Sequence, residues 1–352
     1  MDSLVSAPSK QRLLNILERL PTQRIGVIGD LGLDAYWYAD MTRSFISPET
    51  PLFPHPVIRE VYTPGAGANV AHNLKDQGVG HVFVFSVLGT EWQGDLLRSI
   101  MSEREIDITT LLVSPHRTTT TYIKPILTGY NCQQEDARID FENADPLSPA
   151  IEDRLLDSLA SHLPGLDALL VADQLDLNGI ITPRVRETLN ALAAKHTDKI
   201  FLVDSRQHIG LFRNMILKPN WVEATAAVHP ELETHTIDID ALKDIGHTLR
   251  IQTGRTVFVT LSERGVLVCS EEGCEQIPAG PVRPPLDPVG AGDTFIATLA
   301  ATLAAGATSR EAGIIANLAA AIALEKLNQT GTASPEELLE RLKLAQSGDE
   351  NA

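Results

Sequence analysis

The chain has 352 residues, of which 43% are hydrophobic, and its 46 acidic and 29 basic side chains give a formal net charge of −17 at pH 7. A chain of this length and hydrophobic content can bury one large core. The negative charge argues against nucleic acid or an anionic membrane as a partner, because both are bound through basic patches. An anionic ligand must therefore be attracted by local features of its site.

The three cysteines, Cys132, Cys269 and Cys274, have neither Cys-x-x-Cys spacing nor the paired histidines of a zinc site. We therefore expect no disulfide framework, no structural zinc and a reducing, cytoplasmic location. No apolar run approaches the ~20 residues of a membrane span. Residues 1–23 form a polar amphipathic extension that lacks the apolar core of a signal peptide, and we expect a surface helix packed on the domain.

The first strand is expected at residues 24–30, a short apolar run that ends in Gly29 and Asp30. Residues 31–38 then carry Asp34 and three aromatic rings. Asp34 is either a loop or capping carboxylate or an acceptor for hydroxyl groups of a ligand such as a sugar, whose face the rings would cover.

A small projecting sheet is expected from two parts of the chain. Residues 41–62 hold four prolines between short β-prone pieces, which is too broken for a core strand and suits an edge strand. Strands expected at 108–113, 118–127 and 133–141 would complete this sheet, so the projecting strands fall at about 41–62 and 108–141. Between them, residues 64–71 form a glycine turn that opens a helix ending near Gly78.

A parallel sheet covered by helices on both faces is predicted from the rest of the chain, because apolar strands alternate with amphipathic helices. The strands are expected at 82–89, 168–173, 200–204 and 256–261, and the helices at 92–104, 151–163, 183–195 and 239–253. A hairpin begins at 265–269, and residues 346–352 are expected to be a disordered tail. Ligands of such sheets bind at the carboxyl ends of strands, where Asp30, Asp173, Asp204 and Asn220 fall.

Residues 286–295 form a tight glycine turn that leads into an Ala- and Leu-rich helix ending at Gly306. The first N–H groups of a helix lack partners inside it, and the peptide dipoles make that end electropositive. Because Gly290 and Gly292 have no β-carbon, an anion can approach the amides of Gly290, Ala291, Gly292 and Asp293 closely.

Asp293 places a carboxylate in this anion-binding turn. A carboxylate beside a bound phosphate is repelled, so its presence needs a reason. An aspartate that accepts the proton of an attacking hydroxyl is a recurring part of phosphoryl transfer. The alternative is a helix cap, a common position for aspartate.

The string Asp-x-x-Gly-Ala-Gly-Asp-Thr-Phe at 287–295 resembles the C-terminal signature of the ribokinase-like sugar kinases, the PfkB family. The similarity runs over about 24–342 and implies one kinase domain at 24–345. It also implies an α/β fold: a three-layer α/β/α body with a mostly parallel sheet and a small β-sheet lid. Strings at 29–38, 46–51, 67–71 and 138–142 are most similar to the heptose-phosphate kinases of lipopolysaccharide core synthesis.

The resemblance implies roles for residues that match the family's motifs. Asp293 would be the catalytic base, and the turn Gly290, Ala291 and Gly292 would be the anion hole. The residues implied to bind the substrate are Asp34, Gly65, Gly67, Asn69 and Arg138.

ATP and Mg²⁺ are the implied cofactors. Asn220 and Glu223 keep an Asn-x-x-Glu pattern, and Glu223 would hold Mg²⁺ through water, although it could also be a solvated helix residue. Asn317 would approach the base or form an interhelical hydrogen bond. The other implied ATP-binding residues are Thr260, Ser262 and Gly265, and a monovalent cation, K⁺, is implied at Asp287 and Val289.

The chain departs from the heptose-phosphate kinases in residues that concern the substrate. Asn178 stands where they carry a Lys before Gly, and Ser205-Arg206-Gln207 stands where they carry Pro-Lys-Gly. A sugar phosphate needs a basic clamp. The candidates for it are Lys124, Arg138 and Arg206.

Three functions follow as hypotheses. The favoured one is an ATP-dependent kinase of a sugar or a sugar phosphate, with heptose 7-phosphate among the candidates. The others are a nucleoside kinase of the same fold, with rings stacked on a base, and an inert sugar or nucleotide sensor. A homodimer through the lid sheet is also implied by the family.

Overall fold

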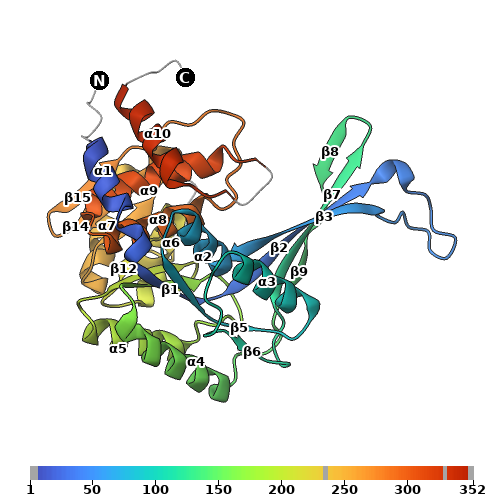
Figure 1. Cartoon of the computed structure of the whole chain (residues 1–352), viewed down its shortest axis with the longest axis horizontal. Helices are drawn as coiled ribbons and strands as arrows, with labels where there is room; N and C mark the ends of the chain where they lie inside the picture. The colour runs from blue at the N-terminus through green and yellow to red at the C-terminus, as the bar shows by residue number, and fades with distance from the viewer. Residues whose placement is uncertain (1–6, 233–236, 328–330, 348–352) are drawn as a thin grey trace.

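The computed structural model describes residues 7–232, 237–327 and 331–347. A large body of helices around a central sheet carries a smaller sheet that projects from one side (Figure 1). The expected α/β class with a mainly parallel sheet and a separate small sheet is therefore confirmed.

The main sheet has eight strands in the order β15-β14-β13-β12-β11-β10-β1-β4. Its strands from β4 to β13 pair in parallel, and β14 and β15 add an antiparallel edge. The central strands are buried along nearly their whole length, as expected for a sheet covered on both faces. The strands are β1 (Arg24–Gly29), β4 (His81–Phe85), β10 (Ala168–Asp173), β11 (Ile200–Ser205), β12 (Ile216–Leu217), β13 (Val257–Thr260), β14 (Val266–Ser270) and β15 (Gly273–Ile277).

The helices divide between two hydrophobic cores, one on each face of this sheet. One core includes side chains of α1 (Lys10–Leu17), α2 (Gly67–Asp76), α3 (Trp92–Glu103), α8 (Ala291–Ala304), α9 (Ser309–Leu324) and α10 (Pro335–Ser347). The other includes side chains of α4 (Pro149–His162), α5 (Pro183–Lys195), α6 (Trp221–Val228) and α7 (Ile239–Thr253). Leu13 and Ile16 are fully buried, so the expected N-terminal surface helix is packed on the body.

The small sheet, called the lid sheet here, has the order β3-β2-β7-β8, with β9 also paired to β7. Its strands are β2 (Leu31–Asp40), β3 (Val57–Ala66), β7 (Thr120–Gly129), β8 (Cys132–Glu135) and β9 (Ile139–Phe141). Strands β7, β8 and β9 lie within the expected lid range of about 108–141.

Two expectations for the lid sheet were wrong. Its central strand, β2, precedes the predicted range 41–62, and residues 41–56 contain no strand, because their prolines interrupt strand pairing. Residues 108–113 contribute only β6 (Leu112–Val113), which pairs with β5 (Val87–Leu88) outside the lid sheet.

Only Asp30 separates β1 of the body from β2 of the lid sheet. Its buried carboxylate accepts hydrogen bonds from the amides of Gln174, Leu175 and Ile180 at 2.7–2.9 Å. Burial raises the pKa of Asp30 to about 6, against the effect of these amides. Asp30 therefore fixes the junction of the two sheets, although its position at a strand end also suits ligand binding.

Two further expectations need correction. Cys269 and Cys274 face each other across the β14–β15 pair and form a disulfide, which their spacing alone did not suggest. Gln346 and Ser347 belong to α10 instead of a disordered tail, and residues 348–352 lie outside the described residues. No helix in the described ranges is both long and apolar enough to span a membrane.

Candidate active site

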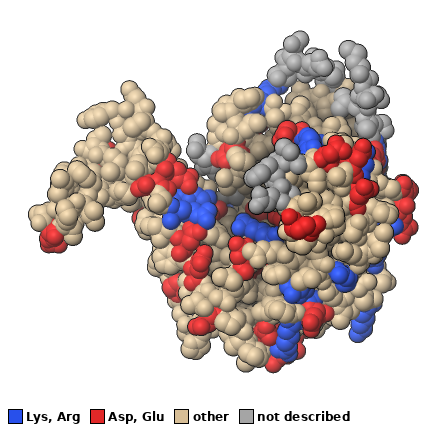
Figure 2. Space-filling view, turned by 180° about the vertical axis from the view of Figure 1, so that it is seen from behind, with Lys and Arg blue, Asp and Glu red and all other residues tan. Residues whose placement is uncertain are grey.

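A cavity of about 500 Å³ lies between the lid sheet and the carboxyl edge of the main sheet. Figure 2 shows acidic and basic side chains gathered where the projecting part meets the body. The lid sheet, the loop after β10 and the start of α8 all contribute to the lining. Residues used below that line it are Asp34, Tyr122, Lys124, Arg138, Asp140, Gln174, Arg206, Val289, Gly290 and Asp293.

The start of α8 presents backbone amides toward the cavity, although that of Ala291 donates a hydrogen bond of 3.3 Å to the carbonyl oxygen of Pro288. Gly290 is the N-cap residue and adopts a left-handed conformation with φ of 81°, which favours glycine. No side chain caps this end of the helix. The turn therefore keeps the geometry of an anion-binding helix start.

Asp293 lies in the first turn of α8 and does not cap the helix, so the capping interpretation is wrong. Its Oδ2 atom instead accepts a hydrogen bond of 2.7 Å from Nδ2 of Asn69, at the start of α2. Asn69 is fully buried, and its backbone oxygen is bound by Asn73. In addition to its implied contact with the substrate, Asn69 thus orients Asp293.

Burial raises the pKa of Asp293 to about 6, and the negative charge of Asp204 adds to this effect. The hydrogen bond from Asn69 and the positive charge of Lys218 oppose it. A pKa near neutrality suits a general base, because the group is ionised at working pH and still has appreciable basicity.

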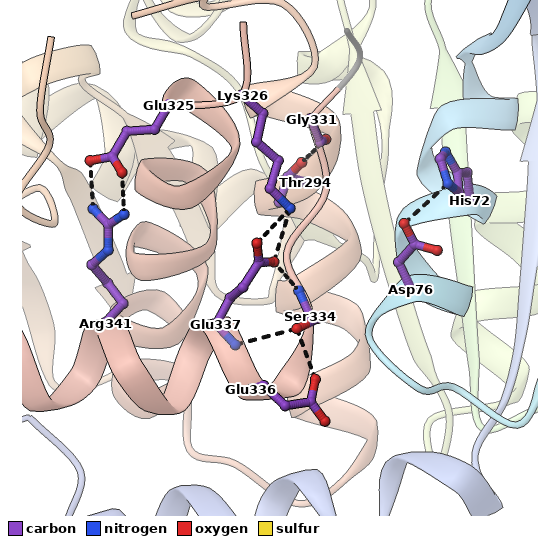
Figure 3. A network of polar contacts seen from close by, with 10 residues as sticks. All are labelled: His72, Asp76, Thr294, Glu325, Lys326, Gly331, Ser334, Glu336, Glu337 and Arg341. Carbon is purple, nitrogen blue, oxygen red and sulfur yellow. Dashed lines mark hydrogen bonds and ion pairs between the residues drawn. The ribbon is translucent and has the colours of Figure 1, made fainter. Parts of the chain in front are cut away.

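The residue after Asp293 ties α8 to the chain beyond α9. The buried hydroxyl of Thr294 donates a hydrogen bond of 2.9 Å to the carbonyl oxygen of Gly331 (Figure 3). Beside it, Lys326 pairs with Glu337 of α10, whose carboxylate also accepts from the backbone of Ser334. The first turn of α8 is therefore held by the loop before α10, through Gly331, and by α2, through Asn69.

On the lid side, Asp34 is buried and forms an ion pair of 3.4 Å with Lys124. A β-carbon on Gly65 would lie 3.2 Å from Cγ of Asp34, so glycine lets β3 run close to this carboxylate. Gly67 donates its amide to the backbone oxygen of Asp30 at 2.8 Å, which sets the start of α2. Asp34 lines the cavity, and Gly65 and Gly67 shape the backbone next to it.

Of the three predicted clamp residues, two are engaged in ion pairs. Arg138 forms two hydrogen bonds of 2.7 Å with Asp140, and its guanidinium lies over the ring of Tyr122. Lys124 is held by Asp34. Arg206 is exposed on the cavity, and no ion pair of its guanidinium is present among the described residues.

On the nucleotide side, Asn220 and Glu223 form a capping box at the start of α6. Burial, followed by the charge of Asp204, raises the pKa of the half-buried Glu223 to about 7. Glu223 is therefore not the solvated helix residue of the alternative interpretation. Thr260 pairs with Asn220 across a β-bridge and so lies next to the same edge.

The remaining predicted ATP residues lie along the neighbouring edge of the sheet. Ser262 and Gly265 both have positive φ angles in the turn between β13 and β14. Asn317 donates a hydrogen bond of 3.0 Å to the carbonyl oxygen of Pro278, so its amide is bound to backbone and not to another helix. It lines a second cavity, of about 320 Å³, together with residues 277–281.

The predicted monovalent-cation residues lie in the loop before α8. The amide of Val289 donates to Oδ1 of Asp287 at 3.0 Å, and the amide of Asp287 donates to the carbonyl oxygen of Leu324 at 2.8 Å. The loop that would order the anion hole is thus tied to the end of α9.

The sequence interpretation missed one residue of this region, Lys218. Its ammonium is buried and forms an ion pair of 3.1 Å with Asp204. The signal in the sequence is a lone lysine between an apolar strand and Pro219-Asn220, where an exposed lysine would be the ordinary interpretation.

Comparison with known proteins decides the family. The profile of the pfkB family carbohydrate kinases matches residues 56–337. The chain belongs to this family. It is therefore a sugar kinase, a phosphotransferase with an alcohol group as acceptor, and the resemblance seen in the signature is confirmed.

Among curated relatives of this pfkB family kinase is the bifunctional protein HldE of Hyphomonas neptunium, 33% identical over 339 residues, which are 95% of this chain and 66% of the relative. The bifunctional protein HldE of Trichlorobacter lovleyi is also 33% identical, over 94% of this chain and 65% of its own length. The chain thus spans just under two thirds of these relatives.

Solved structures support the fold. Phosphofructokinase-2 from Escherichia coli in complex with potassium has a TM-score of 0.68 at 18% identity, over 92% of this chain and 99% of that one. Arabidopsis thaliana ribokinase complexed with ribose and ATP has a TM-score of 0.67 at 15% identity, over 91% and 99%. At such low identity these likenesses support only the fold.

Proposed function

We propose that this sugar kinase transfers the γ-phosphoryl group of ATP to a hydroxyl of a sugar phosphate, with Asp293 as the general base. The observation that carries the proposal is the position of Asp293. Its carboxylate faces the cavity from the same helix turn whose open amides suit an anion, and Asn69 holds it there.

In this mechanism the acceptor hydroxyl lies in the cavity beside Asp293. Asp293 accepts the hydroxyl proton as the oxygen attacks the γ-phosphorus. The amides of the turn at Gly290, Ala291 and Gly292 stabilise the charge on the phosphoryl oxygens. Asp34, Gly65 and Gly67 hold the sugar on the lid side, and the lid excludes water, which would otherwise accept the phosphoryl group.

ATP and a divalent metal follow from the kinase family, and we assign Mg²⁺ to Glu223. The described residues contain no group of three or more His, Cys, Asp or Glu side chains arranged to hold a metal. One carboxylate therefore has to suffice, which suits Mg²⁺ because it keeps most of its waters and binds phosphate oxygens. The residues expected along the nucleotide are Asn220, Thr260, Ser262, Gly265 and Asn317.

The acceptor is proposed to carry a phosphate already, and heptose 7-phosphate is the candidate of this class to test. Arg206 supports this, because it is the predicted clamp residue whose charge is not used in an ion pair within the described chain. The relatives named HldE and the strings similar to heptose-phosphate kinases favour the same class. Arg138 would approach the substrate from the lid.

The nucleoside alternative loses its main support. Tyr36 and Tyr38 are buried in the lid sheet, and the hydroxyl of Tyr36 is bound by Lys124. The aromatic ring that lines the cavity is that of Tyr122, over which Arg138 already lies. A base would therefore have to displace a guanidinium in order to stack.

We also propose that a monovalent cation, K⁺, binds at Asp287 and Val289 and that the protein is a homodimer through its lid sheet. A cation near the first turn of α8 would order the anion hole, because this loop leads directly into it. Exposed apolar side chains on the projecting part of the lid sheet support the dimer.

The test is a screen of ATP consumption with sugars and sugar phosphates, including heptose 7-phosphate and its unphosphorylated form, with and without K⁺. We expect turnover with a sugar phosphate and little with its unphosphorylated form. The Asp293→Asn variant should lose turnover by ~10³-fold or more while it still binds ATP. Near-normal turnover in that variant would remove the assignment of the base.

A further inference from the structure

Lys218 stands where β12 ends at the carboxyl edge of the main sheet, between β11 and β13. Its amide donates a hydrogen bond of 2.9 Å to the carbonyl oxygen of Val203, which extends the pairing of β12 with β11. The residue is only 5% exposed. A lysine this deeply buried is uncommon and needs a charged partner.

The partner is Asp204, at the end of the neighbouring strand, with Nζ of Lys218 and Oδ2 of Asp204 3.1 Å apart. The same carboxylate oxygen is 3.4 Å from Nε2 of Gln174. An ammonium has three donors, and no second side-chain hydrogen bond of Lys218 is present in the described residues. The pair thus fixes the ammonium and leaves donors for a ligand.

Two more carboxylates act on Lys218 besides that of Asp204. Burial lowers the pKa of Lys218, but the charges of Asp204, Glu223 and Asp293 outweigh burial and raise it. In turn, the charge of Lys218 opposes the rise that burial causes in the pKa of Glu223 and of Asp293. The buried ammonium therefore lies within electrostatic reach of the proposed base and of the proposed Mg²⁺ carboxylate.

Lys218 also reaches the anion-binding turn. Its Nζ atom is 3.9 Å from the place that a β-carbon on Gly292 would occupy. Gly292 is one of the turn residues whose amides are free for an anion. The ammonium thus lies beside the anion-binding turn, just behind the residues that line the cavity. A cation at this place would stabilise negative charge that collects at the turn.

We propose that Lys218 is a further catalytic residue, whose ammonium contacts the γ-phosphoryl group during its transfer, with Asp204 as the residue that positions it. This inference rests on the proposed function, in which the phosphoryl group lies at the start of α8. The bond from the γ-phosphorus to the bridging oxygen of ADP breaks, and the bond to the acceptor oxygen forms. The acceptor proton goes to Asp293, and Lys218 keeps its own protons throughout.

A merely structural lysine would neutralise Asp204 and do nothing for the γ-phosphate. The two roles are separated by comparing ADP with the non-hydrolysable analogue AMP-PNP, which differs in carrying the γ-phosphoryl group. The wild type should bind AMP-PNP more tightly than ADP, as measured by calorimetry with Mg²⁺, and Lys218→Met should lose most of this difference in affinity. The same variant should lower kcat by at least ~100-fold. Lys218→Arg should recover part of both.

The matched control is Lys243→Met. Lys243 is an exposed lysine of α7 that pairs with Asp240 by 2.7 Å, away from the cavity. This variant should keep the wild-type kcat and the wild-type ratio of affinities. A loss in Lys218→Met that is matched in Lys243→Met would overturn the proposal.

Lys218→Met leaves the carboxylate of Asp204 buried without its partner, so it risks misfolding. The double variant Lys218→Met/Asp204→Asn removes both charges and should recover thermal stability. We expect kcat to stay low in this double variant. Recovery of kcat together with stability would show that Lys218 only neutralises Asp204, and the inference would fail.

The inference and the proposed function fail in different ways. If Asp293→Asn is inactive and the Lys218 variants turn over normally, the proposed base stands and the role of Lys218 is refuted. If Asp293→Asn keeps its turnover, the base assignment fails whatever the Lys218 variants do.

Discussion

At the scale of single residues, the site depends on how its carboxylates are partnered. Asp293 is bound by one amide from Asn69, and burial raises its pKa to about 6. Asp34 is buried against Lys124, and Glu223 is held in a capping box. Asp34 thus has an ion-pair partner, whereas no ion pair of Asp293 or Glu223 is present within the described chain. The carboxylate of Asp293 is therefore available as a proton acceptor.

The first prediction concerns the pH dependence of turnover. A base with a pKa of about 6 is protonated below that pH, so kcat/KM should fall by about tenfold per pH unit below 6. The measurement is kcat/KM for the acceptor from pH 4.5 to 9 at saturating ATP. An acid limb centred near 3.8, the ordinary value for an aspartate, would contradict the raised pKa.

The second prediction concerns the stability of Asp293→Asn. Because the pKa of Asp293 in the folded protein lies above its unfolded value, ionisation costs folding free energy at neutral pH, and this cost vanishes below the unfolded pKa. The neutral variant should therefore be more stable at pH 8, by on the order of 1 kcal/mol. Asparagine can still accept the hydrogen bond from Asn69.

Urea unfolding of the wild type and of Asp293→Asn at pH 8 and at pH 5 measures this effect. The stability difference should shrink at pH 5, where the wild-type carboxyl is largely protonated. A variant less stable than the wild type at pH 8 would show that Asp293 stabilises the fold.

At the scale of elements, α2 and α8 position the base together. Asn69 of α2 binds Asp293 of α8, and two turns further on the amide of Gln77 binds the hydroxyl of Thr298 at 2.7 Å. The start of α2 is fixed by the hydrogen bond from Gly67 to the backbone of Asp30. Displacing α2 should therefore disturb the base.

The third prediction is that Gly67→Ala lowers both stability and turnover. The new β-carbon would lie 2.8 Å from the carbonyl oxygen of Asp30, so α2 or the β1–β2 junction must shift. We expect a loss of about 1–3 kcal/mol in the free energy of unfolding, with a lower kcat because Asn69 moves. Thermal unfolding and steady-state kinetics measure the two effects.

Gly165→Ala is the control, because the atom nearest to its new β-carbon is a side-chain nitrogen of Arg24 at 3.9 Å. This variant should keep wild-type stability and kcat. Normal kcat in Gly67→Ala with reduced stability would show that Asn69 tolerates a displaced helix.

The sequence predicted the body of the fold better than the lid sheet. Strands at 24–30, 168–173 and 200–204 are continuous apolar runs, a local pattern that needs no knowledge of neighbours. Strand β2 was missed because one of the strands that it pairs with, β7, lies about 90 residues away in the sequence. A strand defined by distant partners leaves a weaker local signal.

The site shows the same division. The turn at 290–293 and the Asn220–Glu223 pattern are local strings, and the structure places both at the carboxyl edge of the sheet. The Lys218–Asp204 pair and the amides around Asp30 join positions 14 and about 150 residues apart, so only the folded chain shows them. The sugar-binding and nucleotide-binding roles remain predictions.

At the scale of the whole molecule, part of the lid sheet projects well away from the body (Figure 1). Its projecting part, residues 41–58 with the β7–β8 hairpin, is called the arm here. Most of the visible surface of the arm in Figure 2 carries no charge. Its exposed apolar side chains are Phe45, Ile46, Leu52, Phe53, Val57, Ile58 and Tyr130. Such a surface on an acidic protein indicates a protein interface.

The fourth prediction is that the arm forms the homodimer interface. Phe45 and Phe53 are 74% and 58% exposed. The double variant Phe45→Ser/Phe53→Ser should be monomeric at concentrations where the wild type is a dimer, as measured by light scattering or sedimentation. Ile251→Ser, an exposed apolar residue on α7, is the control and should leave the mass unchanged. A wild-type mass of about 38 kDa would refute the dimer.

The body and the lid sheet are joined between β1 and β2 by a single residue, Asp30, so no flexible loop separates them there. Asp34 lies four residues further along β2, and the arm begins at the far end of the same strand. Both are therefore connected to the buried Asp30 through β2. In the proposed homodimer, a displacement of the arm by the second copy is therefore expected to shift Asp34 at the cavity. If the protein is the homodimer proposed above, we expect assembly to affect the shape of the cavity entrance through β2.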